Sequence, residues 1–214
     1  MFWEVTLTLL DGFSLTCMIF LWTLLLSLPL GLIVALGSMS GVKVISVPIR
    51  FLVWVVRGTP LMLQILVLFY APGLLFGIQG FDRFPTVVLA FTLNYACYFS
   101  EIYRSGIQSV PRGQYEGAKV LGLNGRQIFF RVILMQVVRR ILPPMGNEVI
   151  TLVKDTALAR VIAVPELLQL AFTRYVSKGL IWPLFYTGAF YLLFVGVITL
   201  LLRFVEKKIG YYQI

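Results

Sequence analysis

Long apolar runs constrain this chain more than any other feature of its sequence. Residues 13–37, 60–78 and 180–202 carry no charged side chain, and about 20 apolar residues are enough for a helix to cross the core of a bilayer. The mean hydropathy of +0.92 is far above the range of globular domains. Because unpaired backbone groups are costly in lipid, such runs fold as helices. The sequence therefore predicts an all-α, polytopic membrane protein that forms one transmembrane domain over its 214 residues.

Five membrane-spanning helices are predicted, at residues 13–37, 60–78, 85–103, 141–163 and 180–202. A further apolar stretch, residues 44–56, comes just before the second span. Joined to it, the two would form about 35 residues or roughly 52 Å of helix, against a core of roughly 30 Å. The earlier stretch is therefore predicted to lie at the interface or to break at Arg57–Pro60.

The distribution of positive charge predicts the orientation. With the N-terminus outside, thirteen Lys and Arg residues fall in inner segments and four fall in outer ones, namely Arg83, Arg160, Arg174 and Lys178. Positive residues favour the cytoplasmic side, so the N-terminus is predicted outside and the C-terminus inside. The net charge of +9 is interpreted as the excess of Lys and Arg that marks cytoplasmic loops, and no nucleic-acid partner is expected. The long connection from Arg104 to Arg140 is then cytoplasmic.

Residue usage disfavours several kinds of catalytic site. The chain has no histidine, which removes Ser-His and Cys-His nucleophile pairs and most zinc sites. Cys17 and Cys97 lie within apolar runs and are expected to be small buried hydrophobes rather than a disulfide. No stretch matches the G-x-x-x-x-G-K-[ST] phosphate-binding loop. We therefore predict no catalytic residue, no metal site and no cofactor in this chain.

The charged segment 111–131 reads as two helices around a turn. Tyr115, Ala118 and Leu121 share one face of the first helix. Gly122 offers a left-handed stop, and Asn124 with Gln127 three residues later forms a pattern typical of a capping box. From the pattern alone, an amphipathic helix on the lipid headgroups and a docking helix are both open.

Four ordered motifs over about 110 residues carry a family resemblance. The stretch "EGAKVLG" (Glu116–Gly122) resembles the EAA loop of ABC-transporter permeases, with Gly117 where an Ala is usual and Met135 where a Pro commonly closes the motif. "RGTPLMLQ" (Arg57–Gln64), "EIYRSGIQSVPRGQ" (Glu101–Gln114) and "NEVITLVKDTALARVIAVPEL" (Asn147–Leu167) look like the polar amino-acid uptake permeases of that superfamily.

The resemblance implies the membrane subunit of a binding-protein-dependent ABC importer. It implies two ATPase subunits that carry ATP and Mg²⁺, a second permease subunit (identical or paralogous), an extracytoplasmic solute-binding protein and a bacterial cytoplasmic membrane. It also implies ATPase coupling through Tyr115, Glu116, Gly117, Ala118, Leu121 and Gly122. The alternative is a secondary, ion-gradient transporter or channel, which would need no docking loop and usually has more spans or paired broken helices. A membrane-embedded enzyme is disfavoured by the missing histidines.

Two charged residues inside the fourth predicted span, Lys154 and Asp155, indicate a substrate site. Lys154 and Asp155 each cost roughly 2.5–3.5 kcal/mol near the membrane centre, so they are expected to face a cavity, each other or the outer interface. An amino-acid ligand would offer both signs to them, with Thr156, Asn94 and Gln64 as further polar candidates. Neighbouring residues on a helix point about 100° apart, so one of the two charges is expected to serve the cavity and the other to brace it or pair across a dimer.

Overall fold

The computed structural model describes residues 2–77 and 81–209, and helices are the regular structure throughout these residues. Their order is α1 (Phe2–Ser38), α2 (Lys43–Gly58), α3 (Leu61–Phe76), α4 (Arg83–Gln108), α5 (Arg112–Val120), α6 (Gly125–Gln127), the π-helical η1 (Ile128–Ile133), α7 (Leu134–Asp155), the 3₁₀-helical η2 (Thr156–Ile162), α8 (Leu167–Arg174), the 3₁₀-helical η3 (Val176–Lys178) and α9 (Trp182–Ile209).

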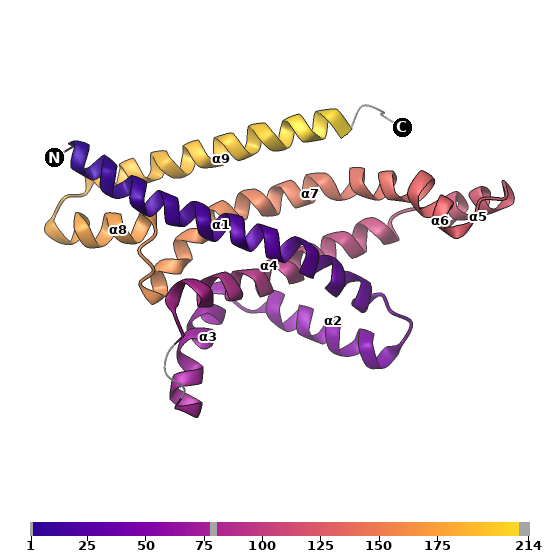
Figure 1. Cartoon of the computed structure of the whole chain (residues 1–214), viewed down its shortest axis with the longest axis horizontal. Helices are drawn as coiled ribbons and strands as arrows, with labels where there is room; N and C mark the ends of the chain where they lie inside the picture. The colour runs from indigo at the N-terminus through magenta and orange to yellow at the C-terminus, as the bar shows by residue number, and fades with distance from the viewer. Residues whose placement is uncertain (1, 78–80, 210–214) are drawn as a thin grey trace.

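The long helices lie beside one another along the long axis of the molecule (Figure 1). Helix α4 is central, because α1, α2, α3 and α7 all pack on it, and α9 packs on α7. Helices α5 and α6 lie at one end of the bundle, and α8 and the start of α9 lie at the other, beside the N-terminal end of α1. The predicted all-α membrane fold is confirmed.

Small residues allow α1 and α4 to approach closely. A Cβ atom added to Gly31 would lie 2.9 Å from the Cβ of Phe99 and 3.0 Å from the carbonyl oxygen of Ala96. The same buried face of α1 carries the hydroxyl residues Thr23 and Ser27. Small residues are typical of helix contacts in membranes, where close packing replaces the hydrophobic driving force. The pairing of α1 with α4 is the most extensive in the fold.

The core is built around α4. Phe91, Tyr95 and Phe99 on this helix are almost fully buried and pack with Ile19 of α1 and Leu152 of α7. Many of the other buried residues of α4 are small or polar, such as Asn94. Helix α4 is therefore covered by protein on most sides, and its composition is less apolar than that of α1 for this reason.

Within the part of the chain that the structure describes, two helices, α1 and α9, are long and apolar enough to cross a membrane alone. Two bent pairs raise the count to four if each pair is one span: α2 with α3, bent by 106°, and Gly125–Ile162 with Leu167–Lys178, bent by 47°. The predicted count of five spans stays a prediction, and the last residue of the predicted second span, residue 78, lies outside the described residues. The predicted break at Arg57–Pro60 is confirmed, since α2 ends at Gly58 and α3 begins at Leu61.

Candidate substrate cavity and coupling segment

A side-chain amide stabilises the break between α2 and α3 by hydrogen bonds to the end of α2. Thr59 and Pro60 both have extended backbone, so the last carbonyl groups of α2 lose their helical partners. The Nε2 of Gln64 donates to the carbonyl oxygens of Val56, at 2.7 Å, and Thr59, at 3.1 Å. The Nδ2 of Asn94 on α4 donates to the Oε1 of Gln64 at 3.0 Å. Gln64 and Asn94 thus connect the break to the central helix.

A cavity of about 570 Å³ lies against this break and is called the central cavity here. Helices α2, α3, α4 and α7 contribute to its wall, together with the start of η2. Its ionisable or polar lining includes Arg57, Asn94, Tyr98, Glu148, Thr151 and Asp155. Arg57 is exposed, and Glu148 and Asp155 are half-buried, so the cavity is partly open. A partly open cavity with charges of both signs in an apolar bundle is typical of a binding site for a small polar ligand.

Tyr95 fixes Asp155 at the wall of the central cavity. Its hydroxyl donates to the Oδ2 of Asp155 at 2.7 Å, and only 2% of the tyrosine is exposed. Asp155 is the last residue of α7, where the chain changes from α-helix to 3₁₀-helix. This change of helix type ends the regular 100° spacing of side chains that applies before it.

Of the five predicted ligand residues, two line the central cavity and three do not. Asn94 and Asp155 line the central cavity, whereas Gln64 lies behind Asn94. Lys154 is exposed on α7 and is not part of the cavity wall. Thr156 is fully buried, and its hydroxyl donates to the carbonyl oxygen of Val153 at 2.7 Å. Ligand contact by any of the five stays a prediction.

Sequence reasoning did not assign Arg57, Glu148 or Tyr98 to the cavity. Glu148 precedes Asp155 by seven residues, so the two carboxylates share one face of α7 about 10.5 Å apart along its axis. That spacing was a usable signal. Arg57 is in the last turn of α2, and the break turns the chain so that Arg57 lines the cavity.

A second cavity of about 600 Å³ adjoins the first toward the α5 end of the bundle. Arg57, Tyr98 and Glu148 belong to both walls. The guanidinium of Arg57 lies 5.1 Å from the centre of the Tyr98 ring. These three residues therefore form the boundary between the two cavities.

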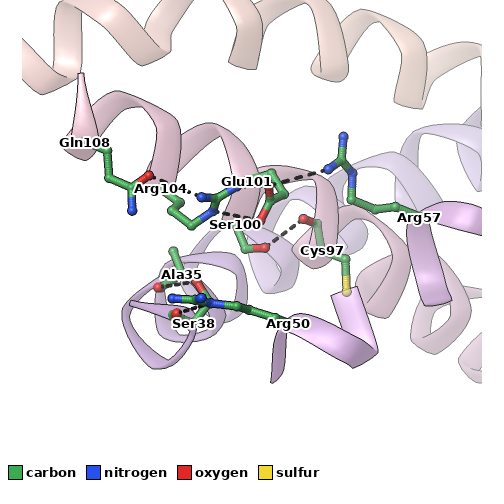
Figure 2. A network of polar contacts seen from close by, with 9 residues as sticks. All are labelled: Ala35, Ser38, Arg50, Arg57, Cys97, Ser100, Glu101, Arg104 and Gln108. Atoms are coloured by element: carbon green, nitrogen blue, oxygen red, sulfur yellow. Dashed lines mark hydrogen bonds and ion pairs between the residues drawn. The ribbon is translucent and has the colours of Figure 1, made fainter. Parts of the chain in front are cut away.

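Glu101 joins two arginines at this boundary (Figure 2). Its carboxylate accepts two hydrogen bonds from Arg104, at 3.0 Å and 2.5 Å, and lies 3.7 Å from the Nη1 of Arg57. The contact with Arg104 is both shorter and bidentate, which is the stronger arrangement for an Arg–carboxylate pair. Arg57 is thus held loosely by Glu101, while Arg104 is held tightly.

The segment 111–131 has the helix–turn–helix form predicted from the sequence. Gly122 has φ of 76°, the left-handed conformation that ends α5. Its N–H donates to the carbonyl of Lys119, and the N–H of Leu123 donates to that of Ala118, which is the hydrogen-bond pattern of a Schellman motif. Asn124 and Gln127 form the predicted capping box at the start of α6. Local sequence signals therefore determine this turn.

Apolar side chains of α5 and the following segment are left uncovered by the chain itself. Ala118 is buried, but Tyr115 is 49% exposed and Leu121 is 81% exposed. Phe129 and Phe130 on η1 are also exposed. Exposed apolar residues on a charged segment are typical of a protein-docking surface.

Comparison with known proteins places the chain among membrane transport components. Residues 27–211 match the family described as binding-protein-dependent transport system inner membrane component. The L-cystine transport system permease protein TcyB of Bacillus subtilis (strain 168) is 39% identical over 171 residues, which cover 79% of this chain and 70% of that protein. The histidine/lysine/arginine/ornithine transport system permease protein HisM of Escherichia coli (strain K12) is 35% identical over 214 residues, with coverage of 92% and 89%.

A solved structure has the same fold. The crystal structure of an amino acid ABC transporter with histidines superposes with a TM-score of 0.85 at 29% sequence identity. The superposition covers 96% of this chain and 95% of that one.

Proposed function

Because the chain belongs to the family of binding-protein-dependent transport system inner membrane components, we infer that it is the membrane-spanning permease subunit of an ABC importer for a polar amino acid. Its work is translocation and not catalysis. The named relatives carry different amino acids, cystine in one case and histidine, lysine, arginine and ornithine in the other. The ligand of this chain must therefore be argued from its own residues.

The observation that carries the proposal is the central cavity with its charges of both signs. A free amino acid has a carboxylate and an ammonium group close together, and a water-poor site must answer both or leave a charge unpaired. Arg57 can meet the carboxylate, while Glu148 and Asp155 can meet the ammonium group. Asn94 and Thr151 add neutral hydrogen-bonding groups to the same wall.

The other predicted ligand residues are proposed to support this site. Gln64 holds the α2–α3 break because its Nε2 donates to the carbonyl oxygen of Val56 and to the two oxygens of Thr59, which share one proton. Thr156 stabilises the change of helix type next to Asp155. Lys154 is exposed, and an exposed ammonium group at membrane depth is costly without a partner. We propose that it braces the site across a contact with the second permease subunit.

The segment from Tyr115 to Gly122 is proposed as the element that docks on the ATPase. Tyr115 and Leu121 would supply the apolar contact, Glu116 the charge and Gly122 the fixed turn. The same proposal assigns ATP and Mg²⁺ to a separate ATPase chain. Two ATPase subunits, a second permease subunit and an extracytoplasmic binding protein complete the proposed assembly.

The protein is proposed to sit in a bacterial cytoplasmic membrane with the N-terminus outside. The docking segment lies at the opposite end of the bundle from the N-terminal end of α1 (Figure 1), which agrees with a cytoplasmic position for α5 and α6. Thirteen Lys and Arg residues against four support the same orientation.

Purification of the tagged chain in mild detergent tests the assembly, because the proposed ATPase should copurify with it. Asp155→Asn and Lys154→Met, tested separately in the reconstituted complex, should each reduce amino-acid transport severely while insertion and ATPase assembly persist. Loss of assembly in both variants would indicate a structural charge pair instead of a substrate site. Unchanged transport in both would refute the proposed site.

A further inference from the structure

Helix α8 lies between two different surroundings. One of its faces packs against the N-terminal part of α1 and the start of α9 (Figure 1), and its Leu167 and Ala171 are fully buried there. The other face lines a further cavity of about 720 Å³, called the outer cavity here, together with Met62 of α3 and several residues of η2. Leu158 belongs to the walls of both the outer cavity and the central cavity. Helix α8 therefore covers a space that adjoins the central cavity.

The segment that carries α8 is bounded by two residues in the left-handed conformation. Ala163 has φ of 55° and Gly179 has φ of 83°, and these residues end η2 and η3, respectively. Hinges of mobile lids are a few residues at the ends of elements, where they absorb changes of φ and ψ. Residues 164–178 therefore form a short unit between two candidate hinges, outside the predicted spans 141–163 and 180–202.

Glu166 joins this unit to α9. Its carboxylate accepts hydrogen bonds from the N–H of Leu168 at 2.8 Å and from the N–H of Gln169 at 2.7 Å, and so caps α8. The hydroxyl of Tyr191 on α9 donates to the Oε2 of the same carboxylate at 3.0 Å. One side chain thus fixes both the first turn of α8 and its contact with α9.

Helix α1 holds the other side of α8. A Cβ atom added to Gly12 would lie 2.8 Å from the Cα of Leu167, and the N–H of Leu167 donates to the Oγ1 of Thr16 at 3.2 Å. The hydroxyl of Tyr175, at the C-terminal end of α8, donates to the Oγ1 of Thr8 at 2.9 Å. Close packing and polar contacts at both ends therefore keep α8 on α1.

The carboxylate of Glu166 lies where a charge is costly. Its side chain is fully buried, and of the described residues none forms an ion pair with it. Arg160 on η2 attracts it from a distance, while the guanidinium of Arg160 lies 4.9 Å from the centre of the Phe172 ring. From α9 it faces the phenol of Tyr191, and from α1 the hydroxyl of Thr16 lies beside the next residue. Buried carboxylates are normally paired with a cation, so this one opposes its own burial.

The charge of Glu166 therefore favours movement of α8 away from α1 and α9. Burial raises the pKa of this carboxyl to about 7, and its hydrogen bonds and Arg160 oppose the rise. When α8 moves outward, the carboxyl meets water and its pKa returns to about 4.3. The closed position thus binds the proton more tightly: acid stabilises it fully below about pH 4, and this advantage is lost as the pH rises through about 7.

We propose that residues 164–178 form a lid over the outer cavity and that Glu166 is its latch. When the lid is closed, the carboxylate is bound by Tyr191 and by the first N–H groups of α8. When it is open, water hydrates the carboxylate, and the outer cavity connects the outer face with the central cavity past Leu158. The proposal deepens the proposed function and rests on it, because it concerns access to the cavity of an importer.

The test measures how fast a thiol in the central cavity reacts with a reagent added from the outer face. Thr151→Cys places the thiol, because Thr151 lines the central cavity and neither the second nor the outer cavity. Cys17 and Cys97 are first replaced by alanine. The reagent is the membrane-impermeant sulfonatoethyl methanethiosulfonate, applied to right-side-out membrane vesicles that contain the full importer complex. Ser177→Cys, exposed next to α8, supplies a reference rate that corrects for the effect of pH on the reaction.

Two substitutions at the latch should have opposite effects. Tyr191→Phe removes a donor from a charged carboxylate, so labelling of Thr151→Cys should become at least about tenfold faster. Glu166→Gln removes the charge and keeps the shape of the side chain, so labelling at pH 8 should become at least about tenfold slower. With Glu166 in place, labelling relative to the reference should rise about tenfold from pH 6 to pH 8, and Glu166→Gln should abolish this dependence.

Tyr186→Phe is the matched control on the same helix. The hydroxyl of Tyr186 lies 3.3 Å from the Oγ1 of Thr6, so this change removes a hydrogen bond between α9 and α1 that does not involve Glu166. Labelling should then change by about twofold or less. Copurification of the ATPase verifies that each variant is assembled.

Faster labelling in both latch variants overturns the lid, because it is the result of a purely structural Glu166. No change in either variant, or labelling that is independent of pH with Glu166 in place, overturns it as well. If Ser177→Cys reacts only in inside-out vesicles, the proposed orientation is wrong, and the same comparison in those vesicles decides the lid. Failure of an ATPase to copurify with the unsubstituted chain contradicts the proposed function, whereas the labelling rates, which need neither nucleotide nor amino acid, still decide the lid.

Discussion

Replacing Gly122 with valine should uncouple the permease from its ATPase. Gly122 has φ of 76°, and the two hydrogen bonds that close the end of α5 depend on that conformation. Apart from Gly122 and its two chain neighbours, no described residue has an atom within 4 Å of the position where a Cβ would be. The penalty of the substitution is therefore one of backbone conformation, and not of a clash inside the chain.

The size of this penalty follows from the geometry. A left-handed conformation costs an L-residue roughly 1–2 kcal/mol, and a β-branched side chain is among the least tolerant there. If the turn opens instead, the two Schellman hydrogen bonds are lost at about 0.5–1.5 kcal/mol each. Either outcome is large enough to displace or fray a nine-residue helix such as α5, because isolated helices of this length are marginal.

The assay is substrate-stimulated ATP hydrolysis by the complex reconstituted with its ATPase and binding protein. Gly122→Val should abolish the stimulation, while substrate binding to the isolated binding protein stays unchanged. Gly122→Asn should retain most of it, because asparagine tolerates the left-handed region. Gly113→Ala, in the first turn of α5 where an added Cβ meets nothing within 4 Å, is the control for a simple gain of side-chain volume.

Normal stimulation in Gly122→Val would refute the role of the turn. Equal impairment by valine and asparagine would refute the conformational argument, since it would point to side-chain volume at a docking surface.

Three further predictions address packing, charge and topology. Gly31→Ala should destabilise the detergent-solubilised protein by about 1–3 kcal/mol through overpacking against α4, which a lower melting temperature would show. Gly188→Ala on α9, where an added Cβ meets nothing within 4 Å, should leave the melting temperature unchanged. Equal melting temperatures of the two variants would contradict the tight α1–α4 contact. Glu116→Lys should abolish substrate-stimulated ATP hydrolysis by reversing the charge of the docking helix, and normal transport would exclude that role. A reporter fused after Gln213, outside the described residues, should be active in the cytoplasm and one within residues 81–84 outside; both on one side would end the five-span scheme.

Local features of the fold were predictable from the sequence because their causes are local. The stop at Gly122 and the capping box of Asn124 with Gln127 need only a few adjacent residues. The break between α2 and α3 follows from its Pro60 and from a run too long for one span. The family motifs supplied the function for the same reason, since each is a continuous stretch.

The membership of the central cavity was not predictable in the same way. Arg57, Asn94 and Asp155 meet only because α2, α4 and α7 pack around one point, and that packing depends on contacts distant in sequence. Asp155 lines the cavity and Lys154 does not, and this difference depends on how α7 is rotated against α4. Hydropathy alone also underestimates how deeply α4 is buried in the bundle, because its polar residues are covered by other helices.

The small-residue face of α1 affects how the protein is made. Helix α1 leaves the ribosome before α4, the helix that covers this face, and α4 ends only at Gln108. About 70 more residues must be added after α1, which takes several seconds at roughly 5–20 residues per second. During that interval Thr23 and Ser27, whose hydroxyls have no hydrogen-bond partner among residues 2–77 and 81–209 of the folded chain, face lipid or the insertion machinery. We therefore expect lipid or the insertion machinery to cover the small-residue face of α1 until α4 has been made and packs on it.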